Sequence, residues 1–308
     1  MYEIQTDVVI VGGGPAGLSA AVAAKKEGAE KVLIIERDEK LGGILQQCIH
    51  PGFGLTYFHK ELTGPEYAGH FKEEALALGA EVLLNSMVLE VIPEESAVIC
   101  VNSEYGMTKV KARSIVLAMG CRERTRAGIM IPETEEFIPC DTLLLSVGLI
   151  PENELSRGAD VKISRITNGP EVNQYMQTSW DNVFACGNVV HVNDLVDNVT
   201  VESMNAGASA ARYAMHKLPE ANREVPSVTG ENVRYLCPQR VKIGEENETV
   251  RLFFRVLHPE LDVVIRVKSG DKVLSEKKAK RVNPGEMCHV EVKTAEITGD
   301  DVTVEVVK

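Results

Sequence analysis

Two short segments of the chain carry side chains that could do redox or acid–base chemistry. In the first, Cys48 and His50 lie just after the pair Gly42-Gly43. An imidazolium next to a thiol favours the thiolate, and a thiolate can cycle through a sulfenic acid. One interpretation therefore makes Cys48 a redox-active thiol with His50 as its partner. The other makes Cys48 a passive thiol close to a bound ligand.

His191 and Asp194 form the second candidate pair and are separated by two residues. An imidazole and a carboxylate at this spacing could act as general acid and base, or could make ordinary loop hydrogen bonds. Cys186 precedes this pair in an Ala-Cys-Gly sequence. A small side chain that packs tightly against its neighbours is the favoured interpretation of Cys186.

The elements that must position these groups begin with a glycine-rich turn. Four apolar residues, 8–11, run into Gly12, Gly14 and Gly17, and the residues that follow favour a helix. In such a strand–turn–helix unit the first glycine permits the turn and the second lets the backbone approach a pyrophosphate. The third lets the helix pack closely on the strand. Pro15 and Ala16 complete the turn at the helix N-terminus, where phosphates bind.

A second predicted strand, residues 31–35, leads into an acidic residue. This residue, Glu36, comes 19 residues after Gly17. A carboxylate at this position can accept hydrogen bonds from both hydroxyls of a ribose. The loop that follows contains Arg37 and Gly42-Gly43, whose backbone can also come near a ligand. The sequence therefore predicts a dinucleotide site without saying which dinucleotide binds.

Composition excludes several classes of partner. The net charge of −12 argues against binding to nucleic acid or to an anionic membrane surface, both of which need clustered Lys and Arg. No apolar run approaches the roughly 18 to 20 residues of a membrane span. The N-terminus lacks a basic segment before its apolar strand, so a cytoplasmic location is expected. Seven cysteines without tight spacing favour reduced thiols, and the absence of CxxC and HExxH motifs predicts no metal site.

The middle of the chain mixes helices and strands. The sequence predicts a helix over 64–78 and short strands between 81 and 116, one of which contains Val88. Alternating polarity in these strands favours a small antiparallel sheet laid on the main sheet. Buried strands that end in glycine are expected at 114–120, 141–148 and 182–187, and a helix is expected at about 201–217. This order of elements indicates an α/β fold of Rossmann type.

From about Arg223 the pattern changes to strands alone. Six strand-like segments are separated by turns rich in Gly, Pro, Asn and Asp, and no helical pattern interrupts them. Roughly 80 residues of this kind favour a small β-sandwich or barrel. We therefore expect an α/β domain at residues 1–222 and an all-β domain at residues 223–308.

The segment from Asn182 to Asn188, Asn-Val-Phe-Ala-Cys-Gly-Asn, resembles the closing flavin-binding motif of the pyridine nucleotide-disulfide oxidoreductases, a family that includes thioredoxin reductase. Where that family has an aspartate that binds the ribityl chain of FAD, this chain has Asn188. An amide still hydrogen-bonds a hydroxyl, although without charge assistance. The resemblance extends over residues 5 to about 217 and implies an FAD site in which a helix N-terminus near residues 200–202 faces the flavin. The FAD-binding residues it implies are Gly12, Gly14, Pro15, Ala16, Gly17, Glu36, Arg37, Gly42, Gly43, Val88, Ala118, Met119, Gly120, Gly187, Asn188 and Val201.

Members of this family also carry an NAD(P)H-binding domain, which this sequence lacks. Only 20 residues lie between Gly120 and Asp141, and the sequence has no second GxGxxG. A nucleotide-binding domain needs on the order of a hundred residues. We infer a seam near residues 132–134, with linker-like residues 128–132 on one side, and expect NAD(P)H to bind only a form with the second domain. An engineered deletion is favoured over a natural one, because pieces of both flanking linkers remain.

The resemblance implies an oxidoreductase whose intact form passes a hydride from NAD(P)H through FAD to a disulfide or another electron acceptor. The catalytic candidates are Cys48, His50 and His191. The sequence around Cys48 and His191 is similar to a branch of the family that accompanies bacterial glycerol-3-phosphate dehydrogenases. The resemblance therefore implies a flavoprotein dehydrogenase or an electron-acceptor protein as the partner. The sequence is also compatible with a homo-oligomer. Two alternatives stay open: a non-catalytic FAD-binding subunit that docks a partner through the β-domain, and a flavin oxidase that uses O₂.

Overall fold

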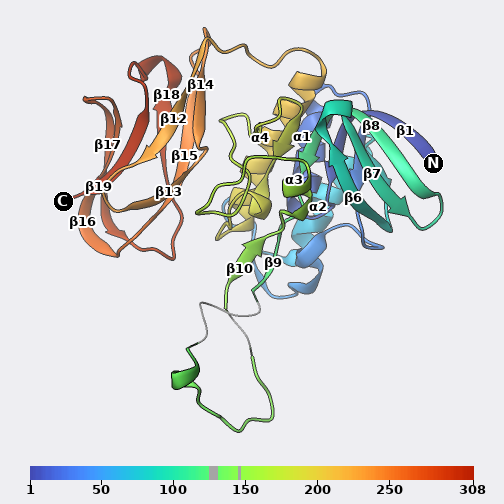
Figure 1. The fold of residues 1–308 in the computed structure, drawn as a ribbon, viewed down its shortest axis with the longest axis horizontal. Coiled ribbons are helices and arrows are strands. Elements are labelled where there is room, and N and C mark those ends of the chain that lie inside the picture. Colours follow the sequence, from blue (N-terminus) through green and yellow to red (C-terminus); the bar gives the residue numbers. More distant parts are fainter. Residues whose placement is uncertain (125–130, 145–146) are drawn as a thin grey trace.

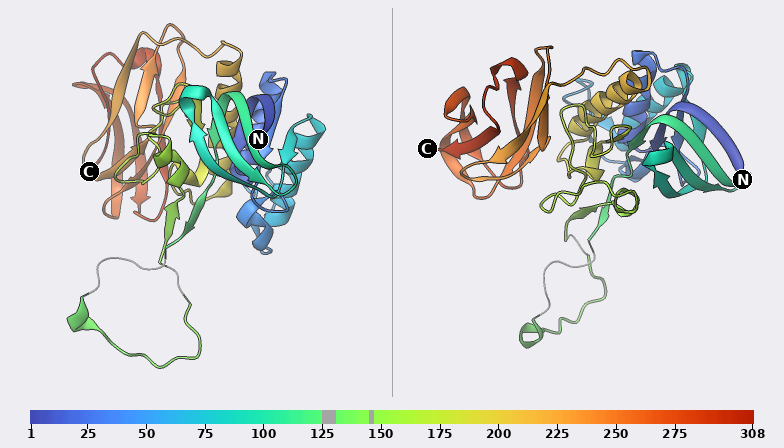
Figure 2. Two further views of the ribbon diagram at one scale, coloured as in Figure 1. Left: turned by 45° about the vertical axis from the view of Figure 1, so that its right-hand side comes forward. Right: turned by 45° about the horizontal axis from the view of Figure 1, so that its top comes forward.

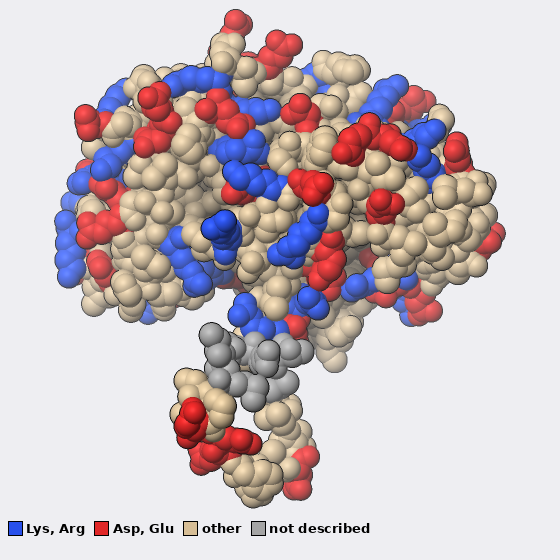
Figure 3. Space-filling view, viewed as in Figure 1, with Lys and Arg blue, Asp and Glu red and all other residues tan. Residues whose placement is uncertain are grey.

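In the computed structural model, which describes residues 1–124, 131–144 and 147–308, an α/β part and a β-rich part lie side by side (Figure 1). Residues 131–144 form a projecting loop that lies away from the α/β part and from the β-rich part in every view (Figure 2). On the face seen in Figure 3, Lys and Arg side chains are interspersed with Asp and Glu, and the projecting loop shows acidic side chains. No helix among the described residues is both long enough and apolar enough to cross a membrane.

One seven-stranded sheet organises the α/β part. Its order is β5-β2-β1-β8-β7-β6, and β11 pairs with β8. The strands run parallel from β5 to β8, and β11 is parallel to β8, whereas β7 and β6 are antiparallel. The bounds are β1 Tyr2–Val11, β2 Val32–Ile35, β5 Glu81–Leu83, β6 Ser86–Ile92, β7 Ala97–Asn102, β8 Gly106–Leu117 and β11 Val183–Ala185. The α/β fold class is therefore confirmed.

The antiparallel strands are hydrogen-bonded to this sheet through β8 and fold back towards its parallel strands, since the Ser86 nitrogen of β6 donates to the Glu36 carbonyl just after β2 at 2.9 Å. The sequence predicts separate strands at 108–111 and 114–118, but β8 runs unbroken from Gly106 to Leu117. Its first half pairs with β7 on one side and its second half with β11, while β1 pairs with it on the other side. The predicted break was wrong because Lys111, Ala112 and Arg113 continue one pleated strand, in which exposed and buried residues alternate, and form no turn.

Three helices cover the central strands: α1 Pro15–Glu27, α2 Gly64–Ala77 and α4 Val196–Ala214. Residues 8–11 of β1 are at most 3% exposed, because parallel strands are covered on both faces. Helix α2 begins with a capping box in which Thr63 and Glu66 exchange hydrogen bonds. The predicted helix at 64–78 is thus confirmed within one residue.

Helix α4 begins at Val196, five residues before the predicted start at Val201. The missed turn contains valine, asparagine and aspartate, which favour helices weakly. A tertiary contact compensates for this weak helix propensity. The Asp197 carboxylate, in the first turn, accepts a hydrogen bond of 3.0 Å from the Thr56 backbone nitrogen. An acid at this end also suits the helix dipole.

The projecting loop starts and ends in a short antiparallel pair, β9 Cys121–Glu123 and β10 Leu149–Pro151. The buried strand predicted at 141–148 was wrong for residues 141–144, which have no strand neighbour and are exposed; residues 145–146 lie outside the described residues. Apolar side chains of the projecting loop are exposed to solvent: Phe137 is 88% and Leu144 89% exposed. The predicted seam at 132–134 is a single 3₁₀ turn, η3, and residues 128–130 of the predicted linker are outside the described residues.

Two sheets enclose a separate apolar core in the β-rich part. Their orders are β14-β12-β19-β16-β17 and β13-β15-β18, and the core between them includes Leu252, Phe254, Val267 and Val304. The bounds are β12 Arg223–Thr229, β13 Val233–Cys237, β14 Arg240–Ile243, β15 Thr249–Val256, β16 Glu260–Ser269, β17 Lys272–Val282, β18 Cys288–Lys293 and β19 Val302–Val307. We propose that the boundary between two domains lies where β12 begins.

The remaining elements are short. They are α3 Glu154–Gly158, the strand pair β3 Pro51–Phe53 and β4 Leu62–Thr63, and 3₁₀ turns at Gly43–Gln47 (η1), Pro93–Glu95 (η2), Gly187–Val189 (η4) and Thr294–Glu296 (η5). Backbone and side-chain hydrogen bonds join the loop at 172–178 to β14 and the residues before it, for example Val172 N to Gln239 Oε1 at 2.8 Å. These bonds attach the β-rich part to the α/β part.

Candidate functional site

The glycine-rich turn between β1 and α1 has the geometry that its sequence predicts. Gly12 has a φ of +106°, and a Cβ there would lie 2.5 Å from the Ala118 carbonyl oxygen. A Cβ on Gly17 would lie 1.8 Å from the Gly12 carbonyl oxygen, so α1 packs directly on the turn. These two glycines are therefore required by the fold itself.

Gly14 differs from its two neighbours in the motif. Its φ is −74°, and a Cβ would meet only the Cα of Gly43, at 3.9 Å. Gly43 in turn has a φ of +54° and follows Gly42, whose backbone nitrogen donates to the Gly13 carbonyl at 2.8 Å. The two glycine segments thus face each other at the N-terminus of α1 without side chains between them, and Pro15 and Ala16 form the first turn of that helix. This arrangement fits the pyrophosphate of a dinucleotide such as FAD.

Glu36 lies at the end of β2 and is only 6% exposed. Its Oε2 accepts from the Gly13 backbone nitrogen at 2.7 Å, and its Oε1 accepts from the Asp38 backbone nitrogen at 2.9 Å. Each carboxylate oxygen keeps a lone pair that a ribose hydroxyl can use. Arg37 points elsewhere and lies 3.6 Å from the Glu152 carboxylate.

The edge of the sheet beyond the turn supplies further backbone groups. The Ala118 nitrogen donates to the Val11 carbonyl at 2.9 Å, Met119 is partly buried, and Gly120 has a φ of +75°. Val88, on β6, is half-buried opposite Cys100 of β7. All of these residues belong to the α/β sheet or to the loop that leaves it.

The closing motif brings η4 against the glycine-rich turn. Gly187 has a φ of +75°, and a Cβ there would lie 2.8 Å from the Ala16 Cβ. Asn188 accepts from the Asn193 backbone nitrogen at 2.9 Å and donates to the Cys121 sulfur at 3.5 Å. Val201 is 43% exposed and lies in the second turn of α4, since that helix begins earlier than predicted. The N-terminus of α4 is therefore at residues 196–199 and not at 200–202.

Cys48 and His50 lie at the end of η1 and in the loop that follows it. The Cys48 thiol is half-buried and donates to the Ile44 carbonyl at 3.4 Å. His50 is exposed, with Nδ1 2.9 Å from the Pro51 carbonyl oxygen and its ring tilted against Phe53. Each side chain is thus bonded to a backbone carbonyl of its own segment.

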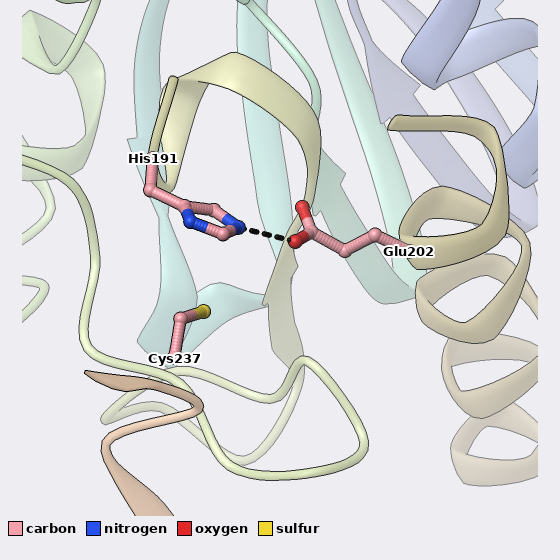
Figure 4. A group of neighbouring side chains, drawn as sticks. All are labelled: His191, Glu202 and Cys237. Carbon is pink, nitrogen blue, oxygen red and sulfur yellow. Dashed lines mark hydrogen bonds and ion pairs between the residues drawn. The ribbon is translucent and has the colours of Figure 1, made fainter. Parts of the chain in front are cut away.

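His191 does not pair with Asp194, which excludes one of the two interpretations of these residues. It is 1% exposed, and its Nε2 lies 2.7 Å from Glu202 Oε2 (Figure 4). Asp194 instead forms an ion pair with Arg255 of β15 and accepts from the Met287 backbone nitrogen at 2.5 Å. The acid–base interpretation was wrong because Asp194 points to the β-rich part, whereas the second turn of α4 places Glu202 next to the imidazole.

Cys237, at the end of β13, completes this group (Figure 4). Burial lowers the pKa of His191, but the Cys237 sulfur and the Glu202 carboxylate raise it by more. The pKa of His191 is therefore well above its usual value. Burial raises the pKa of the Cys237 thiol, and His191 opposes that shift. Sequence analysis missed Glu202 and Cys237, since no short spacing connects them to His191. Cys186 nearby is fully buried, which raises its pKa to about 12, as expected for a packing residue.

Comparison with known proteins identifies a family. The family model for pyridine nucleotide-disulphide oxidoreductase matches residues 6–132 and 125–208. Among curated proteins, the hydrogen cyanide synthase subunit HcnB of Pseudomonas protegens is 33% identical over 125 residues, which are 38% of this chain and 25% of HcnB. The thioredoxin reductase of Ureaplasma parvum is 30% identical over 119 residues, 38% of this chain and 36% of the reductase. The matched segments therefore span well under half of these relatives.

Solved structures share the fold at lower identity. A thioredoxin reductase from Gloeobacter violaceus has a TM-score of 0.54 at 18% identity, with 70% of this chain and 96% of that one covered. The bacillithiol disulfide reductase of Bacillus cereus has a TM-score of 0.57 at 14% identity, with 67% of this chain and 99% of that one covered. At these identities the similarity establishes the fold.

Proposed function

Because the chain belongs to the pyridine nucleotide-disulphide oxidoreductase family, we propose that it is an FAD-dependent oxidoreductase whose intact form passes reducing equivalents from NAD(P)H to a disulfide or other acceptor. FAD, when bound, supplies the two-electron redox chemistry. The observation that supports the proposal best is the close contact between Gly14 and Gly43, which puts no side chain over the N-terminus of α1, where a pyrophosphate would bind.

The roles of the surrounding residues follow from their positions. Backbone nitrogens at the start of α1 would hold the phosphates, and Glu36 would accept from the ribose hydroxyls. Asn188, beside the glycine-rich turn, would hydrogen-bond the ribityl chain. The first turn of α4, residues 196–199, would stabilise negative charge on the ring through the helix dipole.

The proposal includes the loss of NAD(P)H binding in this chain. The family model matches in two pieces that meet at residues 125–132, where a nucleotide-binding domain would be inserted. The described loop residues 131–144 lack a strand and expose Phe137, Leu143 and Leu144. Exposed apolar residues of this kind fit a segment that has lost the surface against which it would pack.

The test is reduction of the bound flavin under anaerobic conditions. Stoichiometric NADH or NADPH should leave the oxidised-flavin absorbance band unchanged over minutes, whereas dithionite should bleach it at once. Dithionite is the control that shows the flavin to be reducible in this protein. Rapid bleaching by NADH, with a rate that saturates as the nucleotide concentration rises, would contradict the loss of the NAD(P)H site.

A non-catalytic FAD-binding subunit is the second candidate. One relative, HcnB, is by name a subunit of a synthase, and the β-rich part offers a separate surface for a partner dehydrogenase or electron carrier. This candidate predicts that the full chain with a nucleotide-binding domain restored between residues 131 and 144 still fails to reduce any disulfide. Turnover of a disulfide by that chimera with NAD(P)H would support the oxidoreductase instead.

A further inference from the structure

A cluster of three metal-ligating side chains lies where the α/β part meets the β-rich part. His191 follows η4, Glu202 lies in α4 and Cys237 ends β13. Their donor atoms all lie within 4.8 Å of one another, and the three residues are 1%, 5% and 1% exposed (Figure 4). A buried thiol, imidazole and carboxylate that converge from three elements make a set of sulfur, nitrogen and oxygen donors.

The groups behind these donors hold them in a ligating orientation. The Glu202 Oε1 accepts from the Gly187 backbone nitrogen at 2.6 Å, which leaves Oε2 directed at His191. The His191 Nδ1 faces the Tyr235 hydroxyl at 3.4 Å, so that hydroxyl can accept from Nδ1–H when a metal ion takes the place of the proton between Nε2 and Glu202 Oε2. Metal-binding histidines and carboxylates are fixed by outer hydrogen bonds of this kind.

A cleft provides access to the cluster. It has a volume of about 410 Å³, lies between α4 and the strands β13 and β15, and is lined by Glu202, Cys237, Tyr175 and Phe253. Two of the three residues thus border a space that can hold an exogenous ligand. Three protein ligands and one open position are the arrangement of a catalytic zinc site.

We propose that His191, Glu202 and Cys237 bind one divalent transition-metal ion, with zinc preferred and a water molecule from the cleft as the fourth ligand. The mixed donor set suits zinc, which accepts thiolate, imidazole and carboxylate. Zinc bonds of about 2.0–2.3 Å place tetrahedral donors roughly 3–4 Å apart. Binding would therefore open the 2.7 Å contact between Nε2 and Oε2 slightly and draw the sulfur inward.

The experiment loads the full chain with zinc, removes free metal by dialysis and measures the bound metal by mass spectrometry. We expect about one zinc ion per chain, and X-ray absorption at the zinc edge should show one sulfur neighbour at about 2.3 Å. The variants Cys237→Ser and Glu202→Gln should each bind zinc at least about tenfold more weakly. Cobalt-loaded protein should show the visible ligand-field bands of a tetrahedral site, free of overlap with flavin at long wavelength.

Two controls separate this site from other thiols. Cys100→Ser replaces a cysteine that is also buried, and Cys140→Ser replaces an exposed one. Both should retain wild-type zinc content. Zinc that is absent from the loaded wild-type protein, that lacks a sulfur neighbour, or that binds Cys237→Ser as tightly as wild type would overturn the proposal. If Cys237→Ser fails to fold, the absorption measurement on wild-type protein decides alone.

Discussion

Within one turn, Gly14 and Gly17 serve different purposes. Gly17 has no room for a side chain because its Cβ position lies 1.8 Å from the Gly12 carbonyl oxygen. Gly14 has room for a methyl group, whose only near neighbour would be Gly43. The fold therefore requires Gly17, whereas we propose that the absence of a side chain at Gly14 serves the binding of a ligand.

This difference predicts opposite results for two alanine variants. Gly14→Ala should cost under about 1 kcal/mol in the free energy of unfolding but weaken FAD binding at least tenfold, or about 1.4 kcal/mol, because its methyl group would stand where the pyrophosphate approaches. Gly17→Ala should cost about 1–3 kcal/mol or more through overpacking. Urea unfolding and flavin fluorescence titration measure the two effects. Tight FAD binding by Gly14→Ala would refute the assignment.

Residues close in sequence could be predicted as a site, and residues distant in sequence could not. The turn glycines and Glu36 belong to one strand–turn–helix–strand unit, so their spacing alone indicates their geometry. Glu202 and Cys237 approach His191 only because the fold brings α4 and the end of β13 close to it. The predicted partner Asp194 was nearer in sequence, but its carboxylate is taken by Arg255.

At the scale of elements, the contact between α1 and α4 depends on small residues. A Cβ on Gly207 of α4 would lie 2.0 Å from the Ala20 carbonyl oxygen of α1. The two helices carry many alanines and serines on their buried sides, which permits this close approach. Since α4 also contributes Glu202, this contact positions the cluster with His191.

The contact predicts a large effect for a small substitution. Gly207→Ala should lower the free energy of unfolding by about 1–3 kcal/mol, because the two helix backbones would have to move apart. Gly69→Ala, in α2, is the matched control: a Cβ there meets nothing within 4 Å. This control should stabilise the protein by about 0.4–1 kcal/mol. Thermal unfolding measured by circular dichroism tests both, and a Gly207→Ala protein as stable as wild type would contradict the packing argument.

The predicted strands formed where a partner strand lies beside the segment, and did not form where the described residues offer no partner strand. The apolar runs at 8–11 and 183–185 become strands because each pairs with β8. The similar run at 141–144 has no strand partner among the described residues and stays irregular. An apolar run predicts the tendency to form a strand, but pairing depends on what else the chain contains.

At the scale of the whole molecule, the segments before and after the projecting loop build one sheet and one helix layer. Strand β11 inserts beside β8, with Val183 opposite Ile115, and the Ser114 hydroxyl donates to the Ala210 carbonyl at 3.0 Å. Removal of a domain from the loop would therefore leave the core intact. Joining two neighbouring chain ends by a short loop has a small entropic cost.

This arrangement predicts that cleavage of the loop leaves the molecule whole. Chymotrypsin should cut first after Phe137, Leu143 or Leu144, which are 71–89% exposed outside helices and strands. A variant with serine at all three positions should resist that cleavage. The two fragments should separate on a denaturing gel but elute together, with FAD, in gel filtration, because β8 with β11 and α1 with α4 hold them together. Fragments that elute apart would show that the loop connection, and not the shared sheet, maintains the fold.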